Sequence, residues 1–145
     1  MIKRFVVIFS FISICVPALA DTFKSEDELK PFVESVMKKV AVDDLTGAFK
    51  LVRPYLAVGD SEFQLAELNS KNQNTLYSSR YGFPVGVEFI EQKKVGESLI
   101  RVVYIEKTEK QALPWVFYFY KPSTVWIFTG FKWSDQLFSG LFDEK

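Results

Sequence analysis

The spacing of apolar residues along the chain changes once, near Phe83. Before this point they recur with the 3.6-residue period of helices, and after it they alternate every second residue and are mostly β-branched or aromatic. Helices followed by strands predict an α+β fold, with N-terminal helices packed on one face of a curved antiparallel meander. No internal repeat or linker is visible, so we expect residues 21–145 to form a single domain.

Three helical segments are expected before the change of period. The first carries an apolar stripe from Leu29 to Val40, which predicts that Phe32 and Val36 are buried, and it begins after a Ser25–Glu28 capping box. The second follows Asp43-Asp44 and ends or kinks at Pro54. The third runs from Gly59-Asp60 through Phe63, Leu65, Leu68 and Leu76 to Tyr81-Gly82, and its polar middle, residues 69–74, is compatible with a break.

Four strands are expected after the helices, at about 84–92, 98–108, 114–121 and 124–133. In the second strand, alternation places Ile100, Val102 and Tyr104 on one side and Arg101 on the other. The tail, 135–145, fits either a short helix or a last edge strand.

The most informative stretch is the hairpin of the last two strands, where nine of the 19 residues from Trp115 to Trp133 are aromatic. A tight turn across 121–124 pairs Phe119 with Trp126 and Trp115 with Gly130. One face then holds Trp115, Phe117, Phe119, Trp126 and Phe128, and the other holds Val116, Tyr118, Tyr120, Val125, Ile127 and Thr129. Both faces are apolar, so we expect the helices to cover one and a pocket, a second copy or another partner to cover the other.

The N-terminus has the pattern of a secretory signal peptide. Lys3 and Arg4 precede an apolar run over 5–16, and small residues lead to a cleavage site after Ala20. Twelve helical residues rise only about 18 Å, short of a bilayer core of about 30 Å, which argues against a membrane anchor. Lipidation of Cys15 is disfavoured because Ile14 stands where a small residue is needed. We therefore expect residues 1–20 to be removed and the mature protein to be periplasmic or secreted, without stable membrane insertion.

Composition excludes several kinds of chemistry. The formal net charge is zero and no polybasic run occurs, so no nucleic-acid partner is expected. Histidine is absent and Cys15 is the single cysteine, which removes histidine triads, cysteine nucleophiles and the common zinc sites. No metal and no cofactor are expected. The absence of an Asn-x-Ser/Thr acceptor makes a bacterial compartment the simplest assignment.

The order of elements resembles a known superfamily. Helices carrying Leu45, Phe49 and the Gly59-Asp60 turn, followed by a meander ending in residues 115–120 and 125–128, are similar to the cone-shaped nuclear transport factor 2-like and cystatin-like folds. The resemblance covers roughly residues 25–133 and rests on pattern, not on a fingerprint motif. It implies helices wrapped around a bent sheet, a cavity between them that hosts ligands or active sites in some members, and an outer sheet face that often forms dimers. No catalytic residue is carried over, because catalytic members place His or Asp/Glu in the cavity and no such spacing is visible here.

Six residues are candidates for ligand binding. Arg101 and Lys132 lie in apolar strands and could hold an anion, although cations at a sheet edge have the same pattern. Tyr104, Tyr118 and Tyr120 could supply hydrogen bonds, and Trp126 could stack on a ligand, although aromatic residues at a core edge or dimer face look alike. No catalytic residues are assigned.

Two functions follow from these features. The first is a non-catalytic periplasmic binding or assembly module, which uses a sheet face or the cone cavity for a small apolar ligand, a homodimer partner or another envelope protein. The second is a small isomerase or hydrolase with an Asp, Glu, Tyr or Lys site in the cavity. An ionisable side chain deep in the cavity with a shifted pKa would favour the second.

Overall fold

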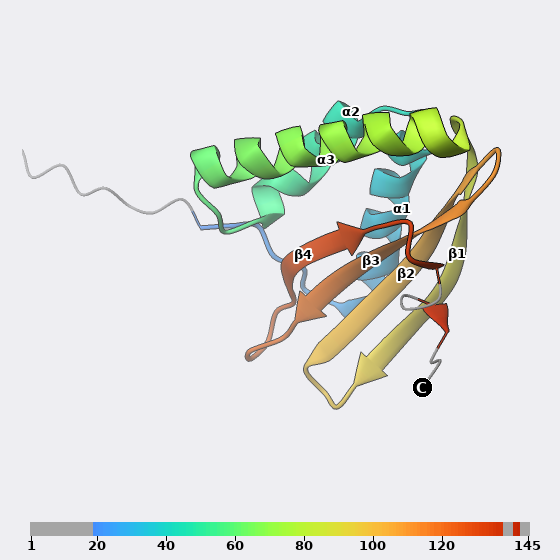
Figure 1. The fold of residues 1–145 in the computed structure, drawn as a ribbon. Coiled ribbons are helices and arrows are strands. Elements are labelled where there is room, and N and C mark those ends of the chain that lie inside the picture. The colour runs from blue at the N-terminus through green and yellow to red at the C-terminus, as the bar shows by residue number, and fades with distance from the viewer. Residues whose placement is uncertain (1–18, 138–140, 143–145) are drawn as a thin grey trace, which may run out of the picture.

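In the described part of the chain, three α-helices precede four antiparallel strands (Figure 1). A computed structural model describes residues 19–137, 141 and 142. The helices are α1 (Leu29–Val40), α2 (Leu45–Val52) and α3 (Asp60–Tyr81), with short 3-10 turns at Glu26–Glu28 and Arg53–Tyr55. The strands are β1 (Pro84–Val95), β2 (Leu99–Thr108), β3 (Ala112–Tyr120) and β4 (Ile127–Trp133). The predicted α+β class is confirmed.

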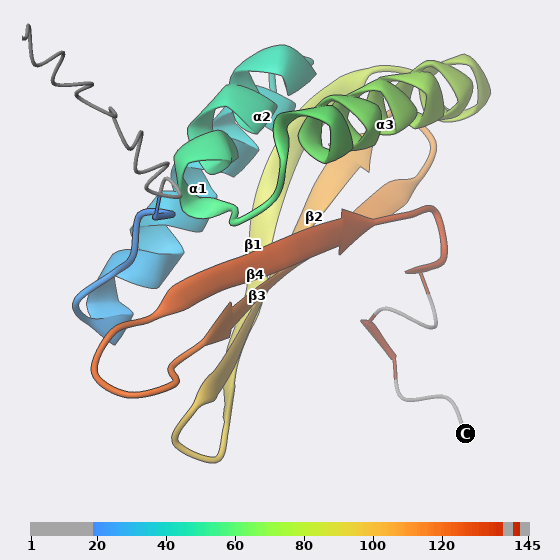
Figure 2. The ribbon, with the colours of Figure 1, turned by 90° about the vertical axis from the view of Figure 1, so that its left-hand side faces the viewer.

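The four strands form one sheet in the order β1-β2-β3-β4. The three described helices lie on the same side of this sheet, as the turned view in Figure 2 shows. We call the side that they cover the inner face and the opposite side the outer face. The predicted tail from 135 to 145 includes residues 138–140 and 143–145, which lie outside the described residues.

Local sequence signals fix where the helices begin. The Ser25–Glu28 capping box is present, with the Glu28 carboxylate accepting a hydrogen bond of 2.9 Å from the Ser25 backbone amide. Asp44 caps α2 by accepting from the Gly47 amide at 2.8 Å, and this bond lowers the pKa of its carboxyl. The segment 69–74 does not interrupt α3, which is one continuous helix.

The core lies between α1, α2 and the inner face of the sheet. Its largest fully buried side chains are aromatic or aliphatic: Trp115, Phe117, Phe119, Phe128, Leu29, Met37, Ile100 and Leu113. All five residues predicted for the aromatic face of the hairpin are buried in this core, as are Ile100, Val102 and Tyr104 of β2. The predicted division of side chains between the two faces is therefore confirmed as far as Phe128.

The predicted hairpin register is wrong. Tyr120 pairs with Ile127, and Phe119 pairs with Phe128 instead of Trp126, so the connection spans 121–126 and is longer than a tight turn. The reason is a contact distant in sequence. The Trp126 amide donates to the Phe23 carbonyl at 2.8 Å and the Phe23 amide donates to the Trp126 carbonyl at 2.9 Å, which takes Trp126 out of the hairpin ladder.

A β-bulge then changes which side chains of β4 face the core. The irregularity lies opposite Tyr118 and Phe119, where Gly130 has a positive φ of 143°. A bulge adds one unpaired residue and so reverses the alternation that follows it. Phe131 and Trp133 consequently face inward beside Trp115, and the indoles of Trp115 and Trp133 stack with centroids 4.6 Å apart.

The first helix supports a test of the core. Val36 is buried as predicted, whereas Phe32 is only partly buried and packs on Phe128, with ring centroids 5.4 Å apart. Because part of the ring remains in solvent, we expect Phe32→Ala to lower the free energy of unfolding by about 3 kcal/mol, the low end for an aromatic truncation. Urea titration followed by circular dichroism measures this. A loss below about 1 kcal/mol would place α1 outside the core.

Candidate functional site

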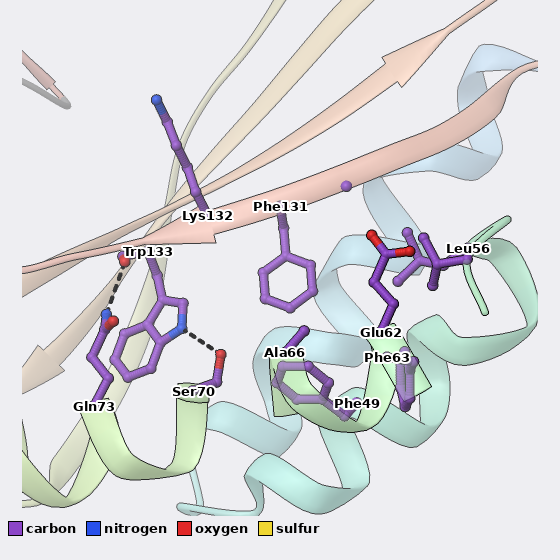
Figure 3. A pocket seen from close by; sticks show the side chains of 12 residues that line it. Phe49, Leu56, Glu62, Phe63, Ala66, Ser70, Gln73, Phe131, Lys132 and Trp133 are labelled. Carbon is purple, nitrogen blue, oxygen red and sulfur yellow. Dashed lines mark hydrogen bonds between the residues drawn. The ribbon is translucent and has the colours of Figure 1, made fainter. Parts of the chain in front are cut away.

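The inner side of the molecule holds a hollow beneath α3, which we call the helix-side cavity. It has a volume of about 430 Å³ and lies between α2, the first half of α3 and β4 (Figure 3). The lining is mainly apolar and aromatic, with a few polar groups: Phe49, Leu56, Val58, Glu62, Phe63, Ala66, Ser70, Gln73, Gly130, Phe131, Lys132 and Trp133. A hollow of this size and composition suits a small organic molecule.

Aromatic rings form much of the wall of this cavity. The Phe49 ring meets Phe63 and Phe131 edge to face, with centroids 5.7 Å and 5.5 Å apart. Figure 3 shows Phe131 pointing from β4 toward the helices. Such edge-to-face contacts are a favourable arrangement of aromatic rings, so the rings of the wall also stabilise one another.

Polar groups of α3 fix the far end of the cavity at Trp133. Its indole Nε1 donates to Ser70 Oγ at 3.4 Å, and Gln73 Nε2 donates to its backbone carbonyl at 3.0 Å. Tyr81 also donates from its hydroxyl to Asp135 at 2.8 Å, a bond that lowers the pKa of Asp135. Polar contacts on one side of the helix thus tie α3 to the end of β4.

The apolar residues of α3 contribute less than their pattern predicts. No residue of α3, all of which is described, is fully buried, and its three leucines, Leu65, Leu68 and Leu76, are exposed. Phe63 is partly buried, and Ala66 is exposed although it lines the cavity. The first half of α3 therefore roofs a hollow and does not pack tightly on the sheet.

The outer face carries a second hollow, which we call the outer groove. Its volume is about 550 Å³ and its lining is Lys93, Val95, Leu99, Ile100, Arg101, Tyr118, Phe119, Tyr120 and Thr129. Three of the six predicted binding residues, Arg101, Tyr118 and Tyr120, are brought together here. None of the three described helices covers this face (Figure 2).

The other three predicted residues lie elsewhere. Tyr104 is buried against Phe89 in the core, and Trp126 is buried there because its backbone pairs with Phe23. Neither lines the helix-side cavity or the outer groove. Lys132 borders the helix-side cavity, but its side chain points away from it (Figure 3) and its Nζ lies 5.8 Å from the centroid of the Tyr118 ring on the outer face.

A buried carboxyl on the inner face was not among the predicted residues. Glu106 is 2 % exposed, and its carboxylate accepts a hydrogen bond of 2.9 Å from Trp115 Nε1. A sequence signal for it exists, because the alternation that places Ile100, Val102 and Tyr104 inward continues to position 106. Burial raises the pKa of Glu106 to about 7, and the nearby Asp43 carboxylate adds to the rise.

The surroundings of Glu106 leave no room for a substrate. Its carboxyl borders a narrow crevice shared with Val40, Asp43, Leu45, Asn74 and Trp115, which is too tight to hold a water molecule. The crevice is separate from the helix-side cavity, whose lining does not include Glu106. A general acid or base must reach its substrate directly or through one water, so Glu106 would need this crevice to open before it could act on a substrate.

A metal site and a membrane-spanning helix are both absent from the described residues. No group of three or more Asp, Glu, Cys or His side chains in the described ranges is placed to hold a metal ion. Among the same residues, no helix is both long and apolar enough to cross a membrane.

Comparison with known proteins adds no relative. No protein-family model, no curated protein sequence and no solved structure matches this chain. The function must therefore be inferred from the structure and the sequence of the molecule itself.

Proposed function

We propose that this protein is a non-catalytic binding module of the bacterial periplasm that holds a small apolar ligand in the helix-side cavity. The observation that carries this proposal is the cavity itself, about 430 Å³ of space beneath α3 with aromatic walls. Ligand sites are typically hollows of about 300 to 1,000 Å³ with a mostly apolar lining and a few polar groups.

The lining indicates the kind of ligand. Rings of Phe49, Phe63, Phe131 and Trp133 favour a flat, apolar molecule that stacks on them or meets their edges. Among the described lining residues Glu62 is the only carboxylate, and it has no hydrogen-bond partner among the described residues. We therefore propose a ligand with an aromatic or fused-ring body and one N–H or O–H donor that reaches Glu62.

Two sequence features support the compartment and the use of the cavity. The signal-peptide pattern at residues 1–20 directs the protein out of the cytoplasm. The resemblance to nuclear transport factor 2-like folds is in keeping with a ligand between helices and sheet, because some members of that superfamily use this space. These features favour a carrier or sensor of a small molecule in the cell envelope.

The enzymatic alternative has one observation in its favour, the raised pKa of the buried Glu106. It requires a substrate next to that carboxyl, and the crevice there is too tight to hold even water. Binding in the helix-side cavity needs no such rearrangement, which is why we prefer it.

Filling the cavity tests the proposal. We expect Ala66→Trp to abolish binding of N-phenylnaphthylamine, a neutral aromatic probe that fluoresces in apolar sites, because the new indole occupies the space beneath α3. The loss of affinity should exceed about tenfold, the equivalent of about 1.4 kcal/mol. Stability should change by less than about 1 kcal/mol, because Ala66 is exposed and is not part of the buried core.

Leu65→Trp is the matched control, since it adds the same indole one residue earlier on the same helix, at a side chain that is 59 % exposed and lines no part of the cavity. The control should bind the probe like the wild type. Equal binding by Ala66→Trp and wild-type protein would contradict the proposed site.

A further inference from the structure

The outer groove combines an apolar floor with unpaired positive charge. Val95 and Leu99 are 54 % and 50 % exposed there, and Tyr118 and Tyr120 add ring surface. Solvent contact of this much apolar side chain costs free energy that a ligand can recover by covering it.

The charge of the groove has one sign. Its nine described lining residues include two cations, Lys93 and Arg101, and no carboxylate. A third cation, Lys132, lies over the Tyr118 ring. The two acidic side chains of β1 nearest these cations are already engaged, Glu91 with Arg101 and Glu88 with Lys107.

Lys93 and Lys132, in contrast, form no ion pair with any described residue. The groove therefore has a positive surplus that an anion would balance.

Arg101 also has a hydrogen-bond donor without a partner among the described residues. Glu91 accepts from its Nη2, whereas its Nε is buried and has no acceptor among the described residues. The side chain as a whole is 39 % exposed although its Nε is not, so a head group in the groove meets the outer guanidinium nitrogens first. A guanidinium fork is suited to a carboxylate, which can accept two of its hydrogen bonds at once.

We infer that the outer groove binds a free single-chain anionic amphiphile, an alkyl carboxylate whose chain lies on Leu99, Val95 and Tyr120 and whose head group is held by Arg101 and Lys93. The occupant is a free molecule and not a membrane surface, because the cations and the apolar residues line a hollow of about 550 Å³. This site is on the opposite face from the helix-side cavity and takes a different class of ligand.

Titration of the purified protein with laurate, followed by amide and methyl chemical shifts, tests the inference. We expect shifts at Leu99, Val95 and Thr129 and none at Ala66 or Ser70, which line the helix-side cavity. Dodecanol, which has the same chain without the charge, should bind at least about tenfold more weakly because it forms no charge-assisted hydrogen bond. Vesicles of anionic phospholipid should not bind.

Single substitutions distinguish the contribution of the charges to laurate binding from an effect on folding. Arg101→Gln should weaken laurate binding about tenfold and Lys93→Gln, at an exposed position, about threefold. Lys107→Gln removes the same charge from β2 outside the groove and should leave the affinity unchanged. Leu99→Asp, which places an acid in the exposed floor, should abolish binding without unfolding.

Several results would overturn the inference. The first is equal affinity for laurate and dodecanol, and the second is an equal loss of laurate affinity in Lys93→Gln and Lys107→Gln. The third is a set of chemical-shift changes confined to the helix-side cavity, and the fourth is binding of vesicles without binding of free laurate. A dimer that sediments as such and excludes laurate would assign the groove to a second copy of the chain. Failure of the Ala66→Trp test, by contrast, bears on the helix-side cavity alone.

Discussion

Trp126→Glu is expected to unfold the protein, whereas Tyr118→Glu is expected to leave it folded. The Trp126 side chain is 2 % exposed and lies in the core. Truncation of a buried tryptophan costs about 3 to 5 kcal/mol, and desolvation of the new carboxylate adds to this. The sum approaches or exceeds a total stability on the order of 5 to 15 kcal/mol.

A glutamate on the outer face is expected to cost much less stability. Tyr118 is partly exposed, and the Lys132 ammonium lies 5.8 Å from its ring centroid, so a carboxylate at this position meets water and a cation. We expect a loss below about 2 kcal/mol, mainly from the lost ring surface. Circular dichroism and urea titration measure both variants.

Trp126→Ala is the companion control, because Lys121 lies 5.1 Å from the Trp126 ring centroid and could partly neutralise a new acid. Unfolding of both glutamate variants would mean that both sheet faces are internal. Two folded variants of unchanged stability would remove the hairpin from the core.

Local patterns were sufficient for the elements and for most of the core. The Leu29–Val40 stripe, the Ser25–Glu28 box and the cap at Asp44 involve residues within a few positions of each other, so the sequence displays the whole interaction. The inward set of β2 followed from alternation for the same reason.

The hairpin register could not be predicted this way. It depends on Phe23, which lies about a hundred positions before its partner Trp126, and no local pattern records that pairing. The bulge at Gly130 adds a second shift, which moves Phe131 and Trp133 to the inner face. The bulge helps to build the helix-side cavity, because the aromatic wall of the cavity includes these two residues.

The two hollows were predictable to different degrees. An apolar outer face with Arg101, Tyr118 and Tyr120 followed from alternation, and these residues line the outer groove. The helix-side cavity lies beneath α3, which contacts β4 through polar groups such as Gln73 to the Trp133 carbonyl, whereas its leucines are exposed. Side-chain hydrogen bonds of this kind have no periodic signature in a sequence.

Glu106→Gln is expected to remove much of the pH dependence of stability. Burial raises the pKa of Glu106 from 4.5 to about 7 in the folded protein, so folding favours the protonated carboxyl. Its stabilising contribution is fully present below the unfolded pKa and is lost as pH rises through the folded one. A shift of this size corresponds to about 3 kcal/mol lost between about pH 4 and pH 8.

Glutamine keeps an oxygen that can accept from Trp115 Nε1 but cannot ionise, so the variant should lack this decline. Urea titrations at several pH values measure it, and the difference in unfolding free energy between variant and wild type should grow by about 3 kcal/mol from about pH 4 to pH 8 in favour of the variant. The new amide N–H groups also need an acceptor in the crevice, and their effect on the free energy of unfolding is the same at every pH. The test is therefore the change of the difference with pH, and not its value at one pH.

Glu88→Gln, at an exposed carboxyl paired with Lys107 on the outer face, is the control and should follow the wild-type pH profile. A constant difference between Glu106→Gln and wild type across this range would mean that Glu106 is ionised in the folded protein at neutral pH, and that its carboxylate is stabilised by more than the bond to Trp115.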